Sequence, residues 1–487
     1  MAQGLATPVL VGVGQVLQRE EDPRRAAEPL ELMLEALRWA GEDAGAPGLL
    51  ERADSIYVLR GAWRYADPGR ELARRLGAAP RESVGTPYGG NFSQACAIDA
   101  ARCIQAGRSD VVLVTGAETG RSAARAERQG IPLRESPAPG APDRRLAEDK
   151  PIFHEAELAR GMNSASDVFA AIESRIRHAR GEGLEAHAER IARLWAGMSE
   201  VACRNPHAWI RKPCSALEIG RAAPGNPMIS YPYTRLMNAN ARVDMGAALL
   251  FCSLATARRA GVRDAKLVFP HAASEADDSA FLSTRAELHR SLALRRAGER
   301  VFELAGLSLA EIDHLDLYSC FPSAVEVAAE ELGAREGRPV TVTGGLTFGG
   351  GPLNSYGLHA IARMAERLRE EPGSTGLVHG NGGWLAKHAV AVYSAEPPAA
   401  GFRYERVEPA LRLREALVDW EGEVMLEAYT VAHREGEPRA ALAACLTPDG
   451  HRTWGRLEDA GVLQAMMREE FCGRPGRLDG RGGLRVE

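Results

Sequence analysis

The sequence has no Cys-X-X-Cys pair and no long apolar run, and these absences exclude several classes of protein. Eight cysteines spread over 487 residues favour free thiols in a reducing compartment over a disulfide framework. Cys203, His207 and Cys214 come nearest to a metal pattern, but no fourth ligand follows at a usable spacing, so we expect no metal site. The apolar stretch from Pro8 to Val16 is too short for a signal or spanning helix, and no basic residue precedes it. We therefore expect a cytoplasmic protein with no membrane partner.

The sequence also lacks an excess of positive charge. Lys and Arg number 60 against 65 Asp and Glu, which gives a formal charge of −5, and the arginines are dispersed. Such a balance offers no basic field to nucleic acid, so we expect no nucleic-acid partner. The nucleotide-binding motifs are missing as well. The stretch "GVGQVL" lacks the third glycine of a dinucleotide fingerprint, and "GGLTFGGGPL" has no Gly-Lys-Ser/Thr.

What the sequence does contain is an alternation of strands and helices. We predict strands at 7–16 (TPVLVGVGQV) and 110–118 (DVVLVTGAE), because both are short apolar runs that end in turn signals. The apolar spacing of 29–45 (PLELMLEALRWAGEDAG) predicts a helix. We predict a second, small-residue helix at 243–262 (VDMGAALLFCSLATARRAGV), packed on a sheet. This alternation favours an α/β fold with a mostly parallel sheet.

One unit of this pattern occurs twice. Segments 88–118 (YGGNFSQACAIDAARCIQAGRSDVVLVTGAE) and 348–383 (FGGGPLNSYGLHAIARMAERLREEPGSTGLVHGNGG) each run from a glycine cluster, through Asn and Ser, into a helix and then a strand. Glycine tolerates the sharp turn that leads into such a helix. The free N–H groups at the start of the helix can also stabilise an anion or an oxyanion. We therefore predict a duplicated βαβ unit, whose glycine-rich loops serve either as tight structural turns or as sites for an anion or oxyanion.

Two further regions differ from this repeat in their amino-acid composition and pattern. Between Thr119 and Asn240 the chain is first Pro-rich and charged and then helical, which indicates a helical insertion into the first α/β unit. After Pro398, segments such as 404–409 (YERVEP) and 423–433 (EVMLEAYTVAH) alternate apolar and polar residues, and Asp-Gly in "TPDGHR" predicts a hairpin turn. We expect a small C-terminal β domain, for which an OB-like barrel is one arrangement.

Five landmarks now stand in a recognisable order: "VLVGVGQV", "VVLVTGAE", "MNANARVDMGAALL", "TGGLTFGGGPLNSYG" and "GLVHGNGGWLAKHAVAVYS". In this order the chain from Pro8 to Glu396 resembles the thiolase superfamily, the acyl-CoA thiolases and condensing enzymes. With its added C-terminal segment, the whole layout resembles thiolase-like proteins of type 1. The resemblance implies two duplicated α/β halves stacked in a five-layer αβαβα fold, with an inserted loop domain that holds coenzyme A.

The resemblance also implies a division of the chain into domains. Residues 1–118 and 240–268 would form the N-terminal thiolase half, and 119–239 the helical loop domain that binds coenzyme A. Residues 269–397 would form the C-terminal half, and 398–487 the additional β-rich domain.

The catalytic chemistry of the superfamily normally rests on four positions, and all four are changed here. The acyl-accepting cysteine aligns with Gly90, and the histidine of Gly-His-Pro aligns with Gly351. The Asn or His that orders the oxyanion water aligns with Tyr318, and the second reactive cysteine aligns with His379. A covalent acyl-enzyme needs a thiolate, and glycine supplies none.

Other side chains could replace the missing groups. Cys320 lies in the "YSCF" motif as a candidate thiol, and His379 could act as a general base because its pKa is ordinarily near neutral. Tyr318 and Tyr356 could polarise or deprotonate a hydroxyl, a role that the resemblance to Cys-free thiolase-like aldolases implies. Each has a structural alternative, namely a buried thiol, a hydrogen-bonded histidine or packed tyrosine rings.

Further cysteines and histidines of the repeat are expected to be structural. Cys96 and Cys103 have the same-face spacing of small core residues. His359, one turn into the second helix, and His388, within the last strand of that half, are expected to be structural as well.

The resemblance places Arg235 and Asn238 where the loop domain lines the coenzyme A channel, and an arginine there could hold a phosphate or simply form a surface ion pair. We expect an acyl-CoA thioester as substrate or ligand, no covalently bound cofactor, and a monomer or homodimer. The function implied is that of an acetyl-CoA acetyltransferase-like acyltransferase without its usual nucleophile. A Cys-independent retro-aldol lyase acting on hydroxyacyl-CoA, or a non-catalytic acyl-CoA binding or scaffold protein, remain the alternatives.

Overall fold

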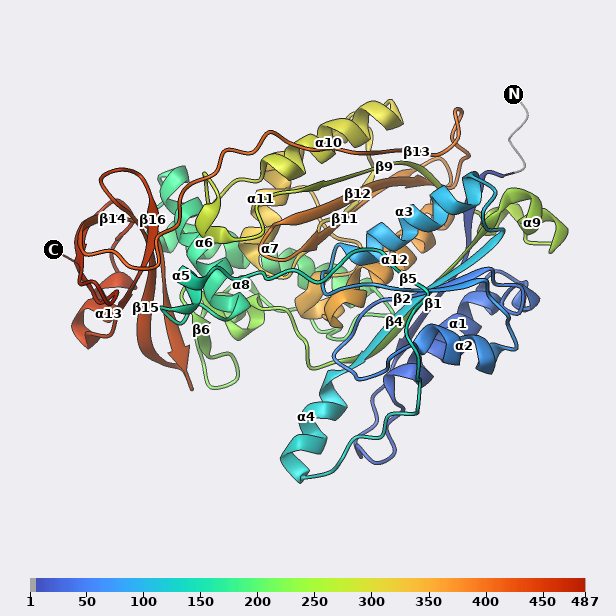
Figure 1. The fold of residues 1–487 in the computed structure, drawn as a ribbon, viewed down its shortest axis with the longest axis horizontal. Coiled ribbons are helices and arrows are strands. Elements are labelled where there is room, and N and C mark those ends of the chain that lie inside the picture. The colour runs from blue at the N-terminus through green and yellow to red at the C-terminus, as the bar shows by residue number, and fades with distance from the viewer. Residues whose placement is uncertain (1–5, 487) are drawn as a thin grey trace.

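The computed structural model describes residues 6–486. The expectation that the N-terminus carries no signal sequence rests partly on residues 1–5, which lie outside the described residues. The N-terminal part forms a six-stranded sheet (Figure 1). Its strands, in the order β1-β8-β4-β2-β3-β5, are β1 (Pro8–Leu17), β8 (Asp244–Ser253), β4 (Val111–Thr119), β2 (Ser55–Val58), β3 (Glu82–Gly85) and β5 (Arg144–Arg145). Helices α1 (Pro29–Asp43) and α2 (Pro68–Leu76) cover its outer face.

The helix predicted at 243–262 is wrong in its first half. Asp244–Ser253 is the fully buried strand β8, and only Leu254–Arg259 forms a helix, α9. A short apolar run that is buried on both faces has no period from which strand and helix can be told apart. Its glycine has a packing role, because a Cβ added at Gly246 would lie 3.0 Å from the Leu32 carbonyl oxygen of α1. Strand β8 runs antiparallel to both β1 and β4, and it is the one reversed strand of a sheet whose other five strands run in the same direction. The sheet is therefore mostly parallel, as predicted.

A second sheet of five strands forms the other half of the α/β core. Its strands, in the order β10-β11-β12-β9-β13, are β10 (His314–Asp316), β11 (Thr375–Gly382), β12 (Lys387–Ser394), β9 (Phe269–Asp277) and β13 (Arg403–Arg406). Strand β13 contains the start of the segment YERVEP, which we assigned to the C-terminal β domain. It instead pairs in parallel with β9 and completes this sheet.

The two helices of the internal repeat lie together between the sheets. Helices α3 (Phe92–Gln105) and α12 (Tyr356–Glu370) contact each other and strands of both sheets (Figure 1). Nearly every residue of α3 is buried, which its alanine-rich sequence permits because small side chains let neighbouring backbones approach. Helices α10 (Leu292–Ala305) and α11 (Pro322–Leu332) form the outer layer next to the second sheet. The layered, duplicated α/β fold predicted from the sequence is confirmed.

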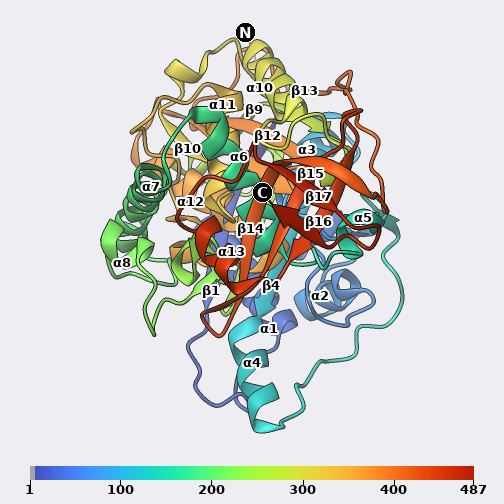
Figure 2. The same ribbon diagram turned by 90° about the vertical axis from the view of Figure 1, so that its left-hand side faces the viewer.

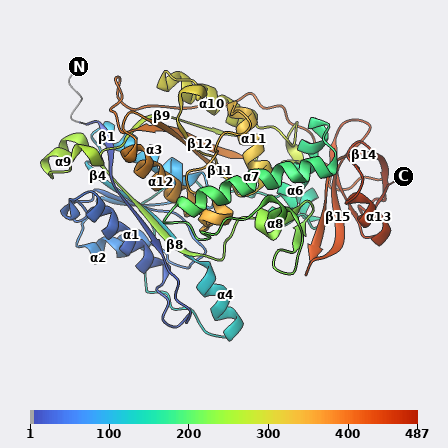
Figure 3. The ribbon, with the colours of Figure 1, turned by 180° about the vertical axis from the view of Figure 1, so that it is seen from behind.

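The insertion after β4 is helical, as its composition predicted. It contains α4 (Gly120–Gln129), α5 (Glu155–Leu158), α6 (Ala165–Arg180), α7 (Leu184–Arg204) and α8 (Ala216–Gly220), followed by the short strands β6 (Met228–Ser230) and β7 (Tyr233–Thr234). Helix α7, drawn in green in Figure 3, lies against α11 of the second half. Within residues 6–486, no helix combines the length and the apolar character that crossing a membrane requires.

The C-terminal segment forms a third sheet with a core of its own (Figure 2). Its strands, in the order β16-β15-β14-β17-β18, are β16 (Arg452–Leu457), β15 (Glu437–Leu446), β14 (Gly422–Arg434), β17 (Pro475–Leu478) and β18 (Leu484–Val486), with helix α13 (Ala460–Met466) beside them. The predicted hairpin joins β15 to β16, and Gly450 of its Asp-Gly turn has φ +82°. A backbone bridge between Arg456 and Gly483 connects the first strand to the last.

The third sheet is attached to the rest of the molecule by buried polar contacts. Strand β6 of the insertion pairs with β14. The guanidinium of Arg452, which is 0% exposed, binds Glu427 at 2.7 and 2.8 Å and donates 2.9 Å to the carbonyl of Ser283 in the second half. The indole N–H of Trp454 donates 2.8 Å to the hydroxyl of the same serine. The C-terminal sheet is therefore a fixed part of the fold.

Candidate active site

Gly90, where the resemblance places the nucleophile, lies just before helix α3 and beside Tyr318. The three atoms nearest to a Cβ added at Gly90 all belong to Tyr318: a ring carbon, Cε2, at 2.6 Å, and two atoms that are closer still, Cζ and the hydroxyl oxygen. Real Cβ atoms are not found this close to other atoms. The tyrosine side chain therefore occupies the space into which a side chain at position 90 would project.

Tyr318 itself is almost fully enclosed. It is 8% exposed, and its ring meets that of Tyr356 edge-on, with ring centroids 5.5 Å apart. Burial raises the pKa of the Tyr318 phenol, so the hydroxyl keeps its proton at neutral pH. Within residues 6–486 this hydroxyl has no hydrogen-bond partner, and it is not among the polar atoms that are completely buried without one. Tyr356 differs, because its hydroxyl donates 2.9 Å to the buried carboxylate of Asp316.

Gly351, where the resemblance places the catalytic histidine, is closed in by backbone. Its N–H donates 3.0 Å to the carbonyl of Asn240, and an added Cβ would lie 3.2 Å from the carbonyl oxygens of Asn240 and Leu346. Two other glycines of the same loop, Gly344 and Gly350, have φ of +95° and +112°, which other residues rarely adopt. The glycine-rich loop is thus shaped for close packing at this point, and a side chain at 351 would require two backbone segments to move.

His379 does not face Gly90. Successive residues of a strand point to opposite faces, and Gly380 is the residue of β11 that faces α3. A Cβ added at Gly380 would lie 3.1 Å from the Asn91 Cα and 3.3 Å from the Gln94 Cβ. His379 therefore projects from the other face of the sheet, and the structure does not bring it together with Tyr318 and Gly90.

On that other face His379 belongs to a buried hydrogen-bond chain. Its Nε2 lies 3.1 Å from Nδ1 of His388, and Nε2 of His388 lies 3.0 Å from the Ser291 hydroxyl, which donates 3.2 Å to Asp278. Nδ1 of His379 is buried without a partner among the described residues. Burial lowers the pKa of His388 to about 3 and that of His379 well below its ordinary value, so both imidazoles are neutral.

The cysteines near the site are buried thiols. Cys320 is 9% exposed, and burial raises its pKa to about 12. Burial also raises the pKa of Cys96 and of Cys103. A thiol rather than a thiolate is therefore present at neutral pH in all three. Cys203, His207 and Cys214 form no ligand group within the described part of the chain.

The comparisons with known proteins concern the domains and the fold. Residues 274–395 match the family described as "Thiolase C-terminal domain-like", and residues 407–482 match "Thiolase-like protein type 1 additional C-terminal domain". The monomeric SCP2-thiolase like protein type 1 (STLP1) from Mycobacterium smegmatis is 27% identical, with full coverage (100%) of both chains and a TM-score of 0.84. By these matches the chain is similar to the thiolase superfamily.

Two further matches are more distant. An acetyl-CoA acetyltransferase from Methanothermobacter thermautotrophicus is 26% identical over 230 residues, a match that covers 42% of this chain and 58% of that relative's length. The Ltp2-ChsH2(DUF35) aldolase is 20% identical, covers 80% of this chain and 98% of its own, and superposes with a TM-score of 0.60. At this identity the aldolase shows the shared fold alone.

In this thiolase-type fold Arg235 and Asn238 lie on the segment that returns from the inserted helices. Arg235 is exposed, and its guanidinium donates to the carbonyl of Gly225. The Asn238 amide donates 2.7 Å to the Thr234 carbonyl and accepts 2.6 Å from the Ser166 hydroxyl. Arg235 is therefore free to meet an anion, whereas Asn238 is engaged in holding the loop.

Three residues near Gly90 were not singled out from the sequence. The carbonyl oxygen of the Asn354 side chain accepts 2.9 Å from the Gly89 N–H, and the Ser93 hydroxyl donates 2.6 Å to the Asn354 backbone carbonyl. The amide oxygen of Asn91 is buried without a partner in the described residues. The repeated Asn and Ser ahead of each helix was the signal for them. In the structure these residues join the two halves of this thiolase-like chain at the start of α3.

Proposed function

We propose that this protein binds acyl-CoA thioesters at the thiolase-type site and carries no acyl group on a cysteine there. The observation behind this proposal is the Tyr318 side chain, which fills the space beside Gly90. A phenol that keeps its proton can donate a hydrogen bond to a thioester oxygen, but it cannot replace a thiolate as nucleophile. Similarity to the thiolase superfamily supports a thioester of coenzyme A as the ligand, and the exposed Arg235 would meet one of its phosphates.

The surrounding thiols support the second part of the proposal. With a pKa of about 12, Cys320 would be ionised to only about one part in 10⁵ at pH 7. Cys96 is 0% exposed and lies in the layer between the sheets, so a thioester would have to displace core side chains to reach it. Acyl transfer by the usual two-step route therefore has no candidate nucleophile of suitable reactivity here.

The unpartnered hydroxyl of Tyr318 favours one catalytic version of this function. In a retro-aldol cleavage, the hydroxyl of a 3-hydroxyacyl-CoA gives its proton to a water molecule and the bond between C2 and C3 breaks, with the electron pair passing to the thioester as an enolate. Tyr318 would donate its proton to that enolate at C2, which yields a shorter acyl-CoA and an aldehyde or ketone. The water would later return a proton to the tyrosine. A binding protein without turnover would use the same tyrosine as a hydrogen-bond donor only.

Three measurements on the full chain separate these functions. Calorimetric titration with coenzyme A should show saturable binding, and its absence would refute the proposal. Intact-mass spectrometry after mixing with acetyl-CoA should show no added acetyl group, whereas an adduct would establish a relocated nucleophile and an acyltransferase. Release of a carbonyl product from 3-hydroxyacyl-CoA that is lost in Tyr318→Phe would establish the lyase, and binding without turnover would leave the scaffold role.

We also propose that the chain is a monomer, because the relative from Mycobacterium smegmatis, which it matches over its full length, is described as monomeric. Light scattering after size-exclusion chromatography tests this directly. A mass of twice 52.4 kDa would show a dimer instead.

A further inference from the structure

A buried group of two carboxylates and one imidazole lies where three helices meet, far along the chain from Gly90. Glu173 comes from α6, His187 from α7 and Glu326 from α11, and one ligand atom of each lies within 4.8 Å of the other two. Glu173 and His187 are 0% and 1% exposed, and the Glu326 side chain is 7% exposed. We propose that these three side chains bind one divalent transition-metal ion, with Zn²⁺ as the ion their donor set fits best.

Each of the three side chains has one polar atom already fixed by a neighbour. Nδ1 of His187 lies 2.7 Å from Glu182, Oε2 of Glu173 accepts 2.5 Å from the Tyr233 hydroxyl, and Oε1 of Glu326 accepts from Arg190. This leaves Nε2 of His187, Oε1 of Glu173 and Oε2 of Glu326 for a metal. Metal-binding histidines and carboxylates are typically held from behind in this way.

The remaining atoms are poorly satisfied by protein alone. Oε2 of Glu326 is buried and has no hydrogen-bond partner among the described residues. Oε1 of Glu173 lies 2.7 Å from Nε2 of His187, and the Glu173 and Glu326 carboxyl groups are close enough to share a hydrogen bond when one of them is protonated. Two ligand atoms around one Zn²⁺ lie about 3.3 Å apart, so the pair of Glu173 and His187 needs to open by well under 1 Å to admit the ion.

Charge in the cluster favours a cation. The carboxylates of Glu173, Glu182 and Glu326 outnumber the guanidinium groups that contact them, which are those of Arg190 and Arg180. Two carboxylates at this distance cannot both stay ionised in a buried site unless a positive charge lies between them. A divalent ion supplies that charge, and the alternative is a proton shared by the two glutamates.

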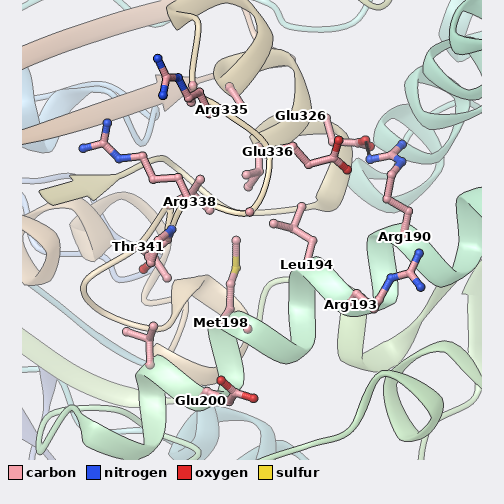
Figure 4. A pocket seen from close by; sticks show the side chains of 18 of the residues that line it. Arg190, Arg193, Leu194, Met198, Glu200, Glu326, Arg335, Glu336, Arg338 and Thr341 are labelled. Carbon is pink, nitrogen blue, oxygen red and sulfur yellow. Dashed lines mark hydrogen bonds and ion pairs between the residues drawn. The ribbon is translucent and has the colours of Figure 1, made fainter. Parts of the chain in front are cut away.

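One of the three side chains reaches a cavity. Glu326 and Arg190 line a space of about 540 Å³ between α7, α11 and segment 334–341, whereas Glu173 and His187 do not line it. Figure 4 shows the Arg190 guanidinium beside the Glu326 carboxylate at one end of this cavity, with Leu194 and Met198 on its α7 wall. Structural zinc sites have four protein ligands, so a zinc ion held by these three would keep one coordination position for water or a small ligand.

The donor set narrows the choice of ion. Carboxylate and imidazole donors without a thiolate suit Zn²⁺, Mn²⁺, Fe²⁺ and Co²⁺. Co²⁺ is the useful probe, because its visible absorption reports nitrogen and oxygen ligation whether or not the protein has an activity.

The test uses the full chain after dialysis against a chelator, titrated calorimetrically with ZnCl₂ and followed by absorption with CoCl₂. We expect one equivalent of each metal to bind. Glu326→Gln removes one ligand while keeping the shape of the side chain, and should weaken binding at least tenfold and change the Co²⁺ spectrum. Glu330→Gln is the matched control, since it lies one turn further along α11 with its side chain 58% exposed, and should bind like the wild type.

Several outcomes would overturn the proposal. The first is that the wild type binds no stoichiometric metal, which would show that the two glutamates share a proton instead. The second is that Glu326→Gln binds metal as tightly as the wild type. A third is loss of binding in His178→Ala instead, because His178 forms another group of potential ligands with Glu470 and Cys472. If Glu326→Gln misfolds by circular dichroism, Glu173→Gln gives the same test from a different helix.

Discussion

The contact between Gly90 and Tyr318 predicts a strong energetic coupling between the two positions. In Gly90→Ala the new methyl carbon would lie 2.6 Å from a ring carbon of Tyr318, and Gly90 does not adopt a left-handed φ that would itself disfavour alanine. Overpacking a rigid, buried site costs about 1–3 kcal/mol, which is the expected loss in unfolding free energy for this variant. Tyr318→Ala should cost about 3–5 kcal/mol, because it removes a buried aromatic side chain.

The double variant separates this explanation from a general sensitivity of the site. Because the three atoms nearest to the added methyl all belong to Tyr318, Gly90→Ala should cost almost nothing once the ring is gone. The double variant should therefore be more stable than the sum of the single effects predicts, by about 1–3 kcal/mol. Guanidinium unfolding followed by tryptophan fluorescence measures all three variants.

Tyr318→Phe is the matched control for this cycle. It removes the hydroxyl but keeps the ring carbon at 2.6 Å, so Gly90→Ala should remain costly in the Phe background. An equal cost of Gly90→Ala in the wild-type, Phe and Ala backgrounds would refute the conclusion that the tyrosine ring occupies the space at position 90.

Three further predictions concern burial elsewhere. Burial raises the pKa of Glu118 to about 7, so the folded protein holds a proton that the unfolded chain releases above pH 4.5, and stability should fall as the pH rises from about 4.5 to 7. Glu118→Gln should then be more stable than the wild type by about 2–3 kcal/mol at pH 8 and show no gain at pH 4, as measured by urea unfolding. Cys320, with its pKa near 12, should react with iodoacetamide at pH 8 about 10³-fold more slowly than an ordinary thiol, with the half-buried Cys203 as internal reference in peptide mapping; comparable rates would contradict its burial. Arg452→Met should lower the unfolding free energy by about 3–5 kcal/mol because it leaves the Glu427 carboxylate unpaired, and Arg452→Met with Glu427→Leu should recover part of that loss; a larger loss in the double variant would show that the ion pair is not the cause.

The sequence predicted the arrangement of the core well where the local pattern of turn, helix and strand agrees with the internal repeat. The two repeat units could be aligned because each glycine-rich turn, helix and strand recurs in one order, and α3 and α12 indeed pack together between the sheets. It failed at Asp244–Ser253, where a strand buried on both faces carries no alternation. The sheet to which the short strand Arg403–Arg406 belongs could not be predicted either, because its partner β9 lies more than a hundred residues earlier in the chain.

In the candidate site, prediction from the sequence was limited by strand register, that is, by which residues of a strand face which side of the sheet. His379 and Gly380 are adjacent, yet only Gly380 faces α3, and a shift of a single residue in the alignment exchanges the two faces of β11. The sequence could not predict the group formed by Glu173, His187 and Glu326, for a different reason. Its members come from three helices that meet only in the folded chain, and no spacing rule connects residues so far apart.

The exchange at positions 90 and 318 bears directly on the choice between a decayed enzyme and a functional site. By the resemblance, a side chain has been lost at Gly90 while a larger one stands at Tyr318, and the ring fills the space that the first change opened. Packing alone would be served equally by phenylalanine, because the Tyr318 hydroxyl has no hydrogen-bond partner in the described residues. This oxygen is also not among the polar atoms that are completely buried without a partner, so it can be reached from outside the protein. A hydroxyl that is free in this way can donate a hydrogen bond to a ligand oxygen, and this is why Tyr318→Phe, rather than any cysteine variant, is the decisive substitution for the function proposed here.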